Sequence, residues 1–154
     1  MSDYATVATA IDTLLKSATG VIAATVYKYE RYTTQDSSYI SSFKDTTGNV
    51  IHGYIITRTK IEETPEASRT NKESCTWLIR MFYALGSSGA TENTTFQPLI
   101  DTIRTKFRAS PSVGGTVLTS EPLQVDRIEN LMFGSVLVHY AEMRLVTEDE
   151  VAYT

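Results

Sequence analysis

The chain has 154 residues, which is enough for one compact domain but not for a second independent core. Fourteen Lys and Arg against eighteen Asp and Glu give a net charge of −4, which argues against a protein that binds nucleic acid by neutralising phosphates. The hydrophobic fraction of 42% is that of a folded domain, and no apolar run reaches the ~20 residues that cross a bilayer. The single cysteine, Cys75, excludes an intramolecular disulfide and fits a reducing compartment.

Two segments have the spacing of amphipathic helices, residues 4–18 and residues 93–109. Apolar side chains recur three or four positions apart at Ala8, Ile11, Leu15 and Ala18, and again at Phe96, Ile100, Ile103 and Phe107. Gly20 follows the first segment as a helix-ending residue. Pro98 is compatible with the second helix only in its first turn, where its missing N–H has no helical partner.

Strands are predicted where the apolar period changes to two. The segments are a short alternation from Thr25, residues 50–61, 74–85, an extended piece at 116–125, and 133–146. In the second segment one face carries His52, Tyr54, Ile56, Arg58 and Lys60. The third segment has the clearest pattern, because alternate positions are apolar from Cys75 to Leu85.

The predicted order is therefore α-β-β-β-α-β-β in one domain spanning residues 1–154. We expect an α+β fold with a mainly antiparallel sheet and two helices packed on one face. Residues 32–47 are interpreted as a long polar loop, the charged stretch 62–72 as a mobile hairpin tip, and Glu148-Asp149-Glu150 as a solvated tail.

The loops carry apolar side chains that build no core of their own. They are Tyr39, Ile40 and Phe43 in one loop, and Leu131, Met132 and Phe133 near another. Exposed apolar groups on loops indicate contacts with partners. An alternative with equal weight is that these loops fold back and bury their apolar side chains against the core.

The candidate chemical groups do not assemble into a known catalytic pattern. His52 and His139 each lie in a predicted strand, and a zinc site would need both of them together with carboxylates. A thiolate–imidazole pair of Cys75 and His139 would need neighbouring strands, yet Cys75 falls on an apolar face where cysteine behaves as a small hydrophobe.

Two further patterns are interpreted as solvent-exposed surface segments. Glu62, Glu63 and Glu66 have the chemistry of acid–base or cation-binding residues, but like charges at a loop tip are usually solvated. The aromatic and basic stretch 27–32 is interrupted by Glu30 and makes a poor nucleic-acid footprint. Phosphate-binding and nucleophile motifs are missing from the sequence. We therefore expect no catalytic residue, no metal, no cofactor and no enzymatic activity.

Four stretches together resemble a known family. They are VYKYERYTTQD, GNVIHGYIITRTKIEE, TWLIRMFYALGSSGATENTTFQPLIDTIRTKFRASPSVGG and MFGSVLVHYAEMRLVTEDE. In their order along the chain and in their local sequence patterns, they are similar to the tail terminator (tail completion) proteins of tailed bacteriophages. The similarity runs from the first helix to the last strand and contains no single diagnostic motif.

The resemblance implies an α+β structural protein of the virion, assembled in the host cytoplasm and located at the head-proximal end of the tail. Such proteins form homohexameric rings that cap the tail tube, end its polymerisation and offer the surface to which the DNA-filled head attaches. The implied partners are other copies of the chain, the major tail tube protein and a head-completion or neck protein. DNA passes through the lumen without specific binding, and no membrane is involved.

From the residues themselves we predict the surfaces of such a ring. The candidate interface residues are Tyr39, Ile40, Phe43, Glu62, Glu63, Glu66 and Arg69. An acidic wall would let DNA slide by repelling phosphates, and Glu148, Asp149 and Glu150 are candidates for it, with a solvated outer surface as the alternative.

Three alternatives stay open. One is a head-completion or neck connector protein of the same junction. Another is a small ligand-binding or enzymatic α+β domain with His139, Cys75 and Trp77 near a pocket. The third is a monomeric adaptor that binds one partner.

Overall fold

The computed structural model describes residues 3–21, 25–28, 43, 51–67, 69–84, 95–133 and 136–152. Its elements are α1 (Tyr4–Ser17), β1 (Val26–Tyr27), β2 (His52–Ala67), β3 (Thr70–Ala84), α3 (Gln97–Arg108), β4 (Thr119–Ser120), β5 (Gln124–Phe133) and β6 (Val136–Ala152). The predicted α+β class is confirmed. The predicted order is wrong in one respect, because three strands and not two follow the second helix.

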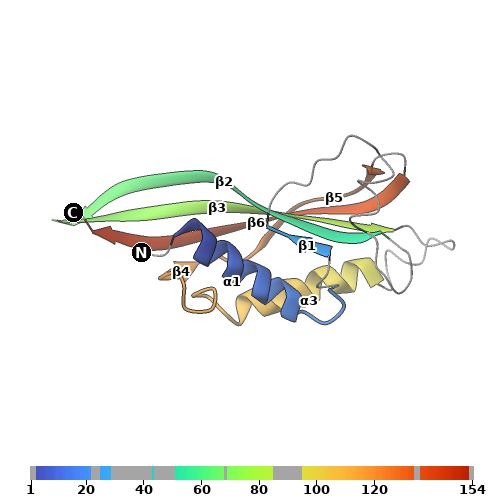
Figure 1. Cartoon of the computed structure of the whole chain (residues 1–154), viewed down its shortest axis with the longest axis horizontal. Coiled ribbons are helices and arrows are strands. Elements are labelled where there is room, and N and C mark those ends of the chain that lie inside the picture. Colours follow the sequence, from blue (N-terminus) through green and yellow to red (C-terminus); the bar gives the residue numbers. More distant parts are fainter. Residues whose placement is uncertain are drawn as a thin grey trace.

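The six strands of the described residues form one sheet in the order β1-β2-β3-β6, with β4 and β5 both on the outer side of β6. β1 runs parallel to β2, and every other pairing is antiparallel. β2, β3 and β6 continue past α1, and β6 ends beside the start of β3 (Figure 1).

Both helices cover the same face of the sheet, here named the helix face (Figure 1). The Asp3 side chain starts α1 by accepting a hydrogen bond from the Thr6 amide at 2.8 Å, and this bond lowers the pKa of Asp3. Pro98 lies in the first turn of α3, as predicted. The main core consists of apolar residues of α1 and α3 packed against alternate residues of the sheet, among them Ile11, Ile103, Trp77, Ile79 and Met143.

A second apolar cluster lies on the opposite face, here named the far face. Its buried members are Phe43, Ile51, Ile55, Phe82, Val138 and Tyr140. The Phe43 carbonyl accepts a hydrogen bond from the His52 amide at 2.8 Å, and the Phe43 ring occupies the space where a Cβ on Gly53 would stand. The prediction of Phe43 as an exposed interface residue is therefore wrong, because its side chain is fully buried.

The charged stretch predicted as a mobile hairpin tip is mostly strand. The β2–β3 ladder continues through Glu62↔Ser74 and Glu63↔Glu73 to Ala67↔Thr70, next to Arg69 in the turn. Thr59 is an extra residue in β2 and forms a bulge, so Arg58 pairs with Trp77 on the helix face while Lys60 pairs with Thr76 on the far face. The prediction that Lys60 shares a face with Arg58 is corrected by this bulge.

β5 is the strand that sequence periodicity missed. Its pairing with β6 shifts register between Val125 and Arg127, so its alternation is interrupted after the second residue. Leu131 and Met132, predicted near a loop, pair with Val138 and Leu137 in this β5–β6 hairpin.

Replacing Phe43 with Ala should lower the free energy of unfolding by about 3 kcal/mol, since it empties the centre of the far-face cluster. Denaturant titration of the dilute protein measures this change. Ile61→Ala is the control, because Ile61 is 50% exposed and its loss should cost less than about 1 kcal/mol. A Phe43→Ala variant as stable as the parent would contradict the burial of this side chain.

Candidate assembly surface

The distal part of the long strands extends past α1 and is here named the arm (Figure 1). It consists of residues 59–67 of β2, 70–76 of β3 and 146–152 of β6. Every β2 residue of the arm is exposed, whereas the β3 residues are half-buried or buried between their neighbours. The arm is thus a paired extension of β2, β3 and β6 with a fully exposed outer strand, β2, while β4 pairs with the root of its β6 strand. The exposed strand indicates a surface for contacts rather than a core element.

The candidate acidic residues fall on opposite faces of the arm. Side chains alternate along a strand, and residues paired across strands share a face. Glu62, Ser74 and Glu148 form one row on the far face, and Glu63, Glu73 and Asp149 form the next row on the helix face. Glu148, Asp149 and Glu150 belong to β6 and are not a free tail, and they cannot line one lumen together because Asp149 points away from its neighbours.

The far face of the arm is mixed in charge rather than acidic. Lys72 forms an ion pair with Glu148 at 2.8 Å, and the hydrogen bond to Glu148 raises the pKa of Lys72. Lys60 pairs with Glu62 at 2.8 Å. An acidic wall built from this face alone is therefore weaker than the sequence suggested.

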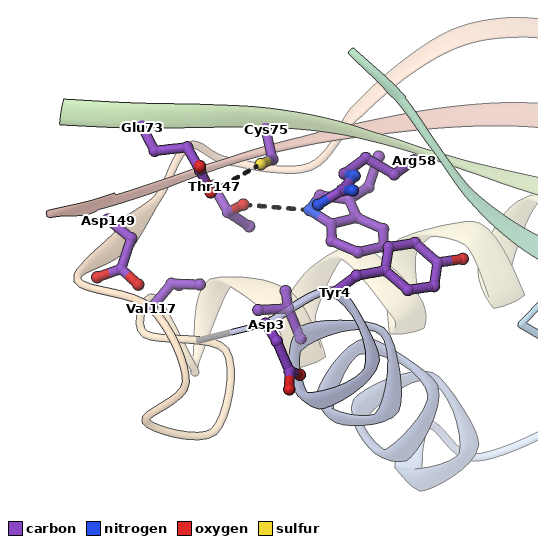
Figure 2. Close-up of a pocket in the computed structure, with 10 residues that line it drawn as sticks. Asp3, Tyr4, Arg58, Glu73, Cys75, Val117, Thr147 and Asp149 are labelled. Carbon is purple, nitrogen blue, oxygen red and sulfur yellow. Dashed lines mark hydrogen bonds between the residues drawn. The ribbon is translucent and has the colours of Figure 1, made fainter. Parts of the chain in front are cut away.

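Aromatic packing fixes the root of the arm against α1. Tyr4 stacks on Trp77 with ring centroids 5.5 Å apart, the Arg58 guanidinium lies 4.9 Å from the Tyr4 ring centre, and the Trp77 indole donates to Thr147 Oγ1 at 3.1 Å. Figure 2 shows these groups around a small hollow that Cys75 and Glu73 also line. The hollow encloses about 10 Å³, which is room for about one water molecule and not for a metabolite.

Cys75 and His139 do not form a catalytic pair. The register partner of Cys75 on β6 is Thr147, and that of His139 on β3 is Tyr83, so the two residues lie eight positions apart along adjacent strands. At ~3.3 Å per residue they are separated by ~26 Å. Burial, helped by the Glu73 carboxylate, raises the pKa of the Cys75 thiol, which is the opposite of what a nucleophilic cysteine needs.

The two histidines are buried on either side of a half-buried tyrosine, Tyr83. His52, Tyr83 and His139 are register partners across β2, β3 and β6. His52 Nε2 lies 2.6 Å from the Tyr54 hydroxyl, and His139 Nδ1 lies 2.8 Å from Asn130 Oδ1. Within the described residues no group of three or more His, Cys, Asp or Glu is placed to hold a metal ion.

The remaining interface candidates separate into two groups. Tyr39 and Ile40 lie outside the described residues. Arg69 is exposed at the arm turn, where it adopts φ = +81°, a left-handed conformation that favours glycine. Glu62, Glu63 and Glu66 lie on the exposed β2 strand of the arm.

Sequence reasoning missed the second flank of the sheet. Ile128, Met132 and Leu137 are exposed apolar side chains of the β5–β6 hairpin. Ile128 pairs with Ala141 of the main core and therefore lies on the helix face, beyond the helices that cover the centre of the sheet. The signal in the sequence was the alternation of Ile128, Asn130 and Met132.

The comparisons with known proteins assign the chain to no family. No protein-family model matches the chain, and no curated protein matches it significantly. Within the described residues, neither helix has the length and apolar character that crossing a membrane requires.

Replacing Arg69 with Gly should raise the free energy of unfolding by about 1 kcal/mol, because glycine adopts the left-handed conformation without steric cost. Thermal denaturation measures the gain. Arg69→Ala is the matched control: it removes the guanidinium but keeps the strained backbone, so no gain is expected. Equal effects of both substitutions would show that the change in stability comes from loss of the Arg69 side chain and not from the backbone conformation.

Alkylation of Cys75 by iodoacetamide should be slower than that of a free cysteine between pH 7 and 9, since its raised pKa reduces the thiolate fraction. Glu73→Gln removes a nearby negative charge, so it should lower the thiol pKa and speed the reaction. Glu63→Gln, on the same face but one strand further away, should leave the rate unchanged. Fast alkylation of the parent protein would restore the case for a reactive thiol.

Proposed function

We propose that this protein is a structural component of a tailed bacteriophage, a tail terminator that forms a ring on the end of the tail tube. The ring ends tube polymerisation and presents the attachment surface for the DNA-filled head. The resemblance of the sequence supplies the family. The observation that best supports an assembly role is the pair of sheet edges that have no partner strand among the described residues.

Both flanks expose backbone in regular strands. From Ile56 to Ala67, the described ladders pair β2 with β3 alone, and β5 pairs only with β6. Such edges carry unpaired N–H and C=O groups and join readily to another strand. A protein that repeats one contact around a closed ring needs two different surfaces on each copy, and the two flanks meet that need.

Because both helices cover the helix face, the far face is the surface that such a ring would turn toward its lumen. Bases and acids are interleaved there, as in the pairs Lys72–Glu148 and Arg127–Glu142. A mixed face of this kind lets DNA pass without strong phosphate binding. The tube protein on one side and the neck protein on the other are the remaining partners of the proposed role.

A neck connector at the same junction uses the same kind of ring. Loss of the gene separates the two roles, because a missing terminator leaves tails of uncontrolled length, whereas a missing neck protein leaves tails of normal length without heads. Tails of normal length that still capture heads would contradict both.

The purified chain should form a ring of about six copies at high concentration, by heterologous contacts that close. Native mass spectrometry gives the number of copies, and negative-stain images show the central opening. The same measurement in the presence of isolated tail tubes covers assembly that the tube triggers. A chain that stays monomeric under both conditions would rule out the ring.

A further inference from the structure

We infer that the ring closes by β-sheet addition, in which the β5 edge of one copy pairs with the β2 edge of the arm of the next. This interface rests on the proposed ring and adds the residues that form it. The strand directions make it possible: neighbours in the series β2, β3, β6, β5 are antiparallel, so β2 and β5 run in opposite directions. Copies placed side by side therefore bring an antiparallel β5–β2 pair together at every junction.

At three central positions, one register of this pair brings together side chains that attract each other. Placing Ile61 opposite Ile128 joins two apolar side chains of the helix face that are 50% and 43% exposed. The same register sets Lys60 opposite Glu129 and Glu62 opposite Arg127. All four of these charged residues lie on the far face, because their ladder partners Thr76, Ser74, Glu142 and Tyr140 lie there. Each contact thus gains an apolar pair, and its four charged residues find oppositely charged partners across the junction.

The charged residues are available for this exchange. Within one copy, Lys60 pairs with Glu62, and Arg127 pairs with Glu129 and Glu142. The side chains of Lys60, Glu62, Arg127 and Glu129 are 59%, 55%, 52% and 41% exposed. Exposed pairs of this kind contribute little to folding, so exchanging them for pairs between copies costs little.

The backbone groups also match in this register. In an antiparallel ladder, residues with the same parity on one strand present their N–H and C=O to the same side. Met81 and Cys75 are six positions apart on β3, so their β2 partners Tyr54 and Ile61 are oriented alike. Tyr54 pairs with Met81, Met81 with Ala141, and Ala141 with Ile128. Because the direction of the backbone groups alternates from one ladder to the next, Ile128 at one edge and Tyr54 at the other both point their N–H and C=O outward or both point them inward. Ile61 and Ile128 therefore form a proper ladder pair.

The offset between the two edges suits a closed ring. Ile61 lies in the row of Thr147 and Ile128 in the row of Ala141, six positions apart on β6. Each copy is thus shifted by ~20 Å along the strand direction relative to its neighbour, and its four strands span ~19 Å across the sheet. These lengths correspond to a strand tilt of about 45°, which is the tilt that closed β-barrels use.

Disulfide trapping tests this register. In a Cys75→Ala background, Ile61→Cys and Ile128→Cys lie more than ~20 Å apart within one copy and cannot bridge there. Mild oxidation should therefore produce a ladder of covalent multimers on a non-reducing gel. The matched control combines Ile61→Cys with Lys106→Cys on the exposed side of α3, and it should give no ladder beyond dimers formed by collision.

Charge reversal gives an independent readout. Lys60→Glu and Glu129→Lys should each weaken association about fivefold or more per contact, and the double variant should recover it. Lys106→Glu makes the same charge change away from both edges and should have no effect. A ring seen by native mass spectrometry that neither forms the disulfide ladder nor responds to charge reversal would overturn this interface and leave the proposed function standing. A parent chain that forms no multimer, with or without tail tubes, would overturn both.

Discussion

The antiparallel ladder between β3 and β6 is the constraint on which the rest of the molecule depends. It runs without interruption from Thr70↔Ala152 to Ala84↔Val138, so it joins the turn of the arm to the buried end of the sheet. Its central residues bury their helix-face side chains under α1 and α3. Because the same two strands continue beyond the helices, the arm inherits its order from the core and needs no core of its own.

This continuity explains how a strongly charged segment stays regular. The β2 part of the arm contains Lys60, Glu62, Glu63, Pro65 and Glu66, a composition typical of loops. It is nevertheless a strand, because β3 offers a rigid ladder on one side and β2 is an edge on which Pro65 is tolerated. Charges and a proline on an edge strand also limit indiscriminate pairing with other chains. Such an edge favours a partner with matching charges and register.

The proposed role and the proposed interface follow from the same feature, a sheet with two edges that pair with no further strand in the described part of the chain. Two helices bury the centre of one face, and the far-face cluster around Phe43 covers one end of the other. The β2 edge of the arm and the β5 edge lie at opposite flanks and at different heights along the strands. A closed ring removes both edges at once, which a single small domain of this topology cannot do alone.

The sequence alone determined the elements whose side-chain period is strong. The helix from Tyr4, the strand around Trp77 and the α+β class were all predicted, because one buried face imposes a period of 3.6 or 2 on the residues themselves. Only the tertiary structure decided the rest. The bulges at Thr59 and Asp126 reverse the side to which later residues point, so the face of Lys60 and the existence of β5 could not be read from alternation. The burial of Phe43, the separation of Cys75 from His139 and the split of the acidic residues between two faces all depend on which strands become neighbours and in what register, and these long-range pairings leave no local period in the chain.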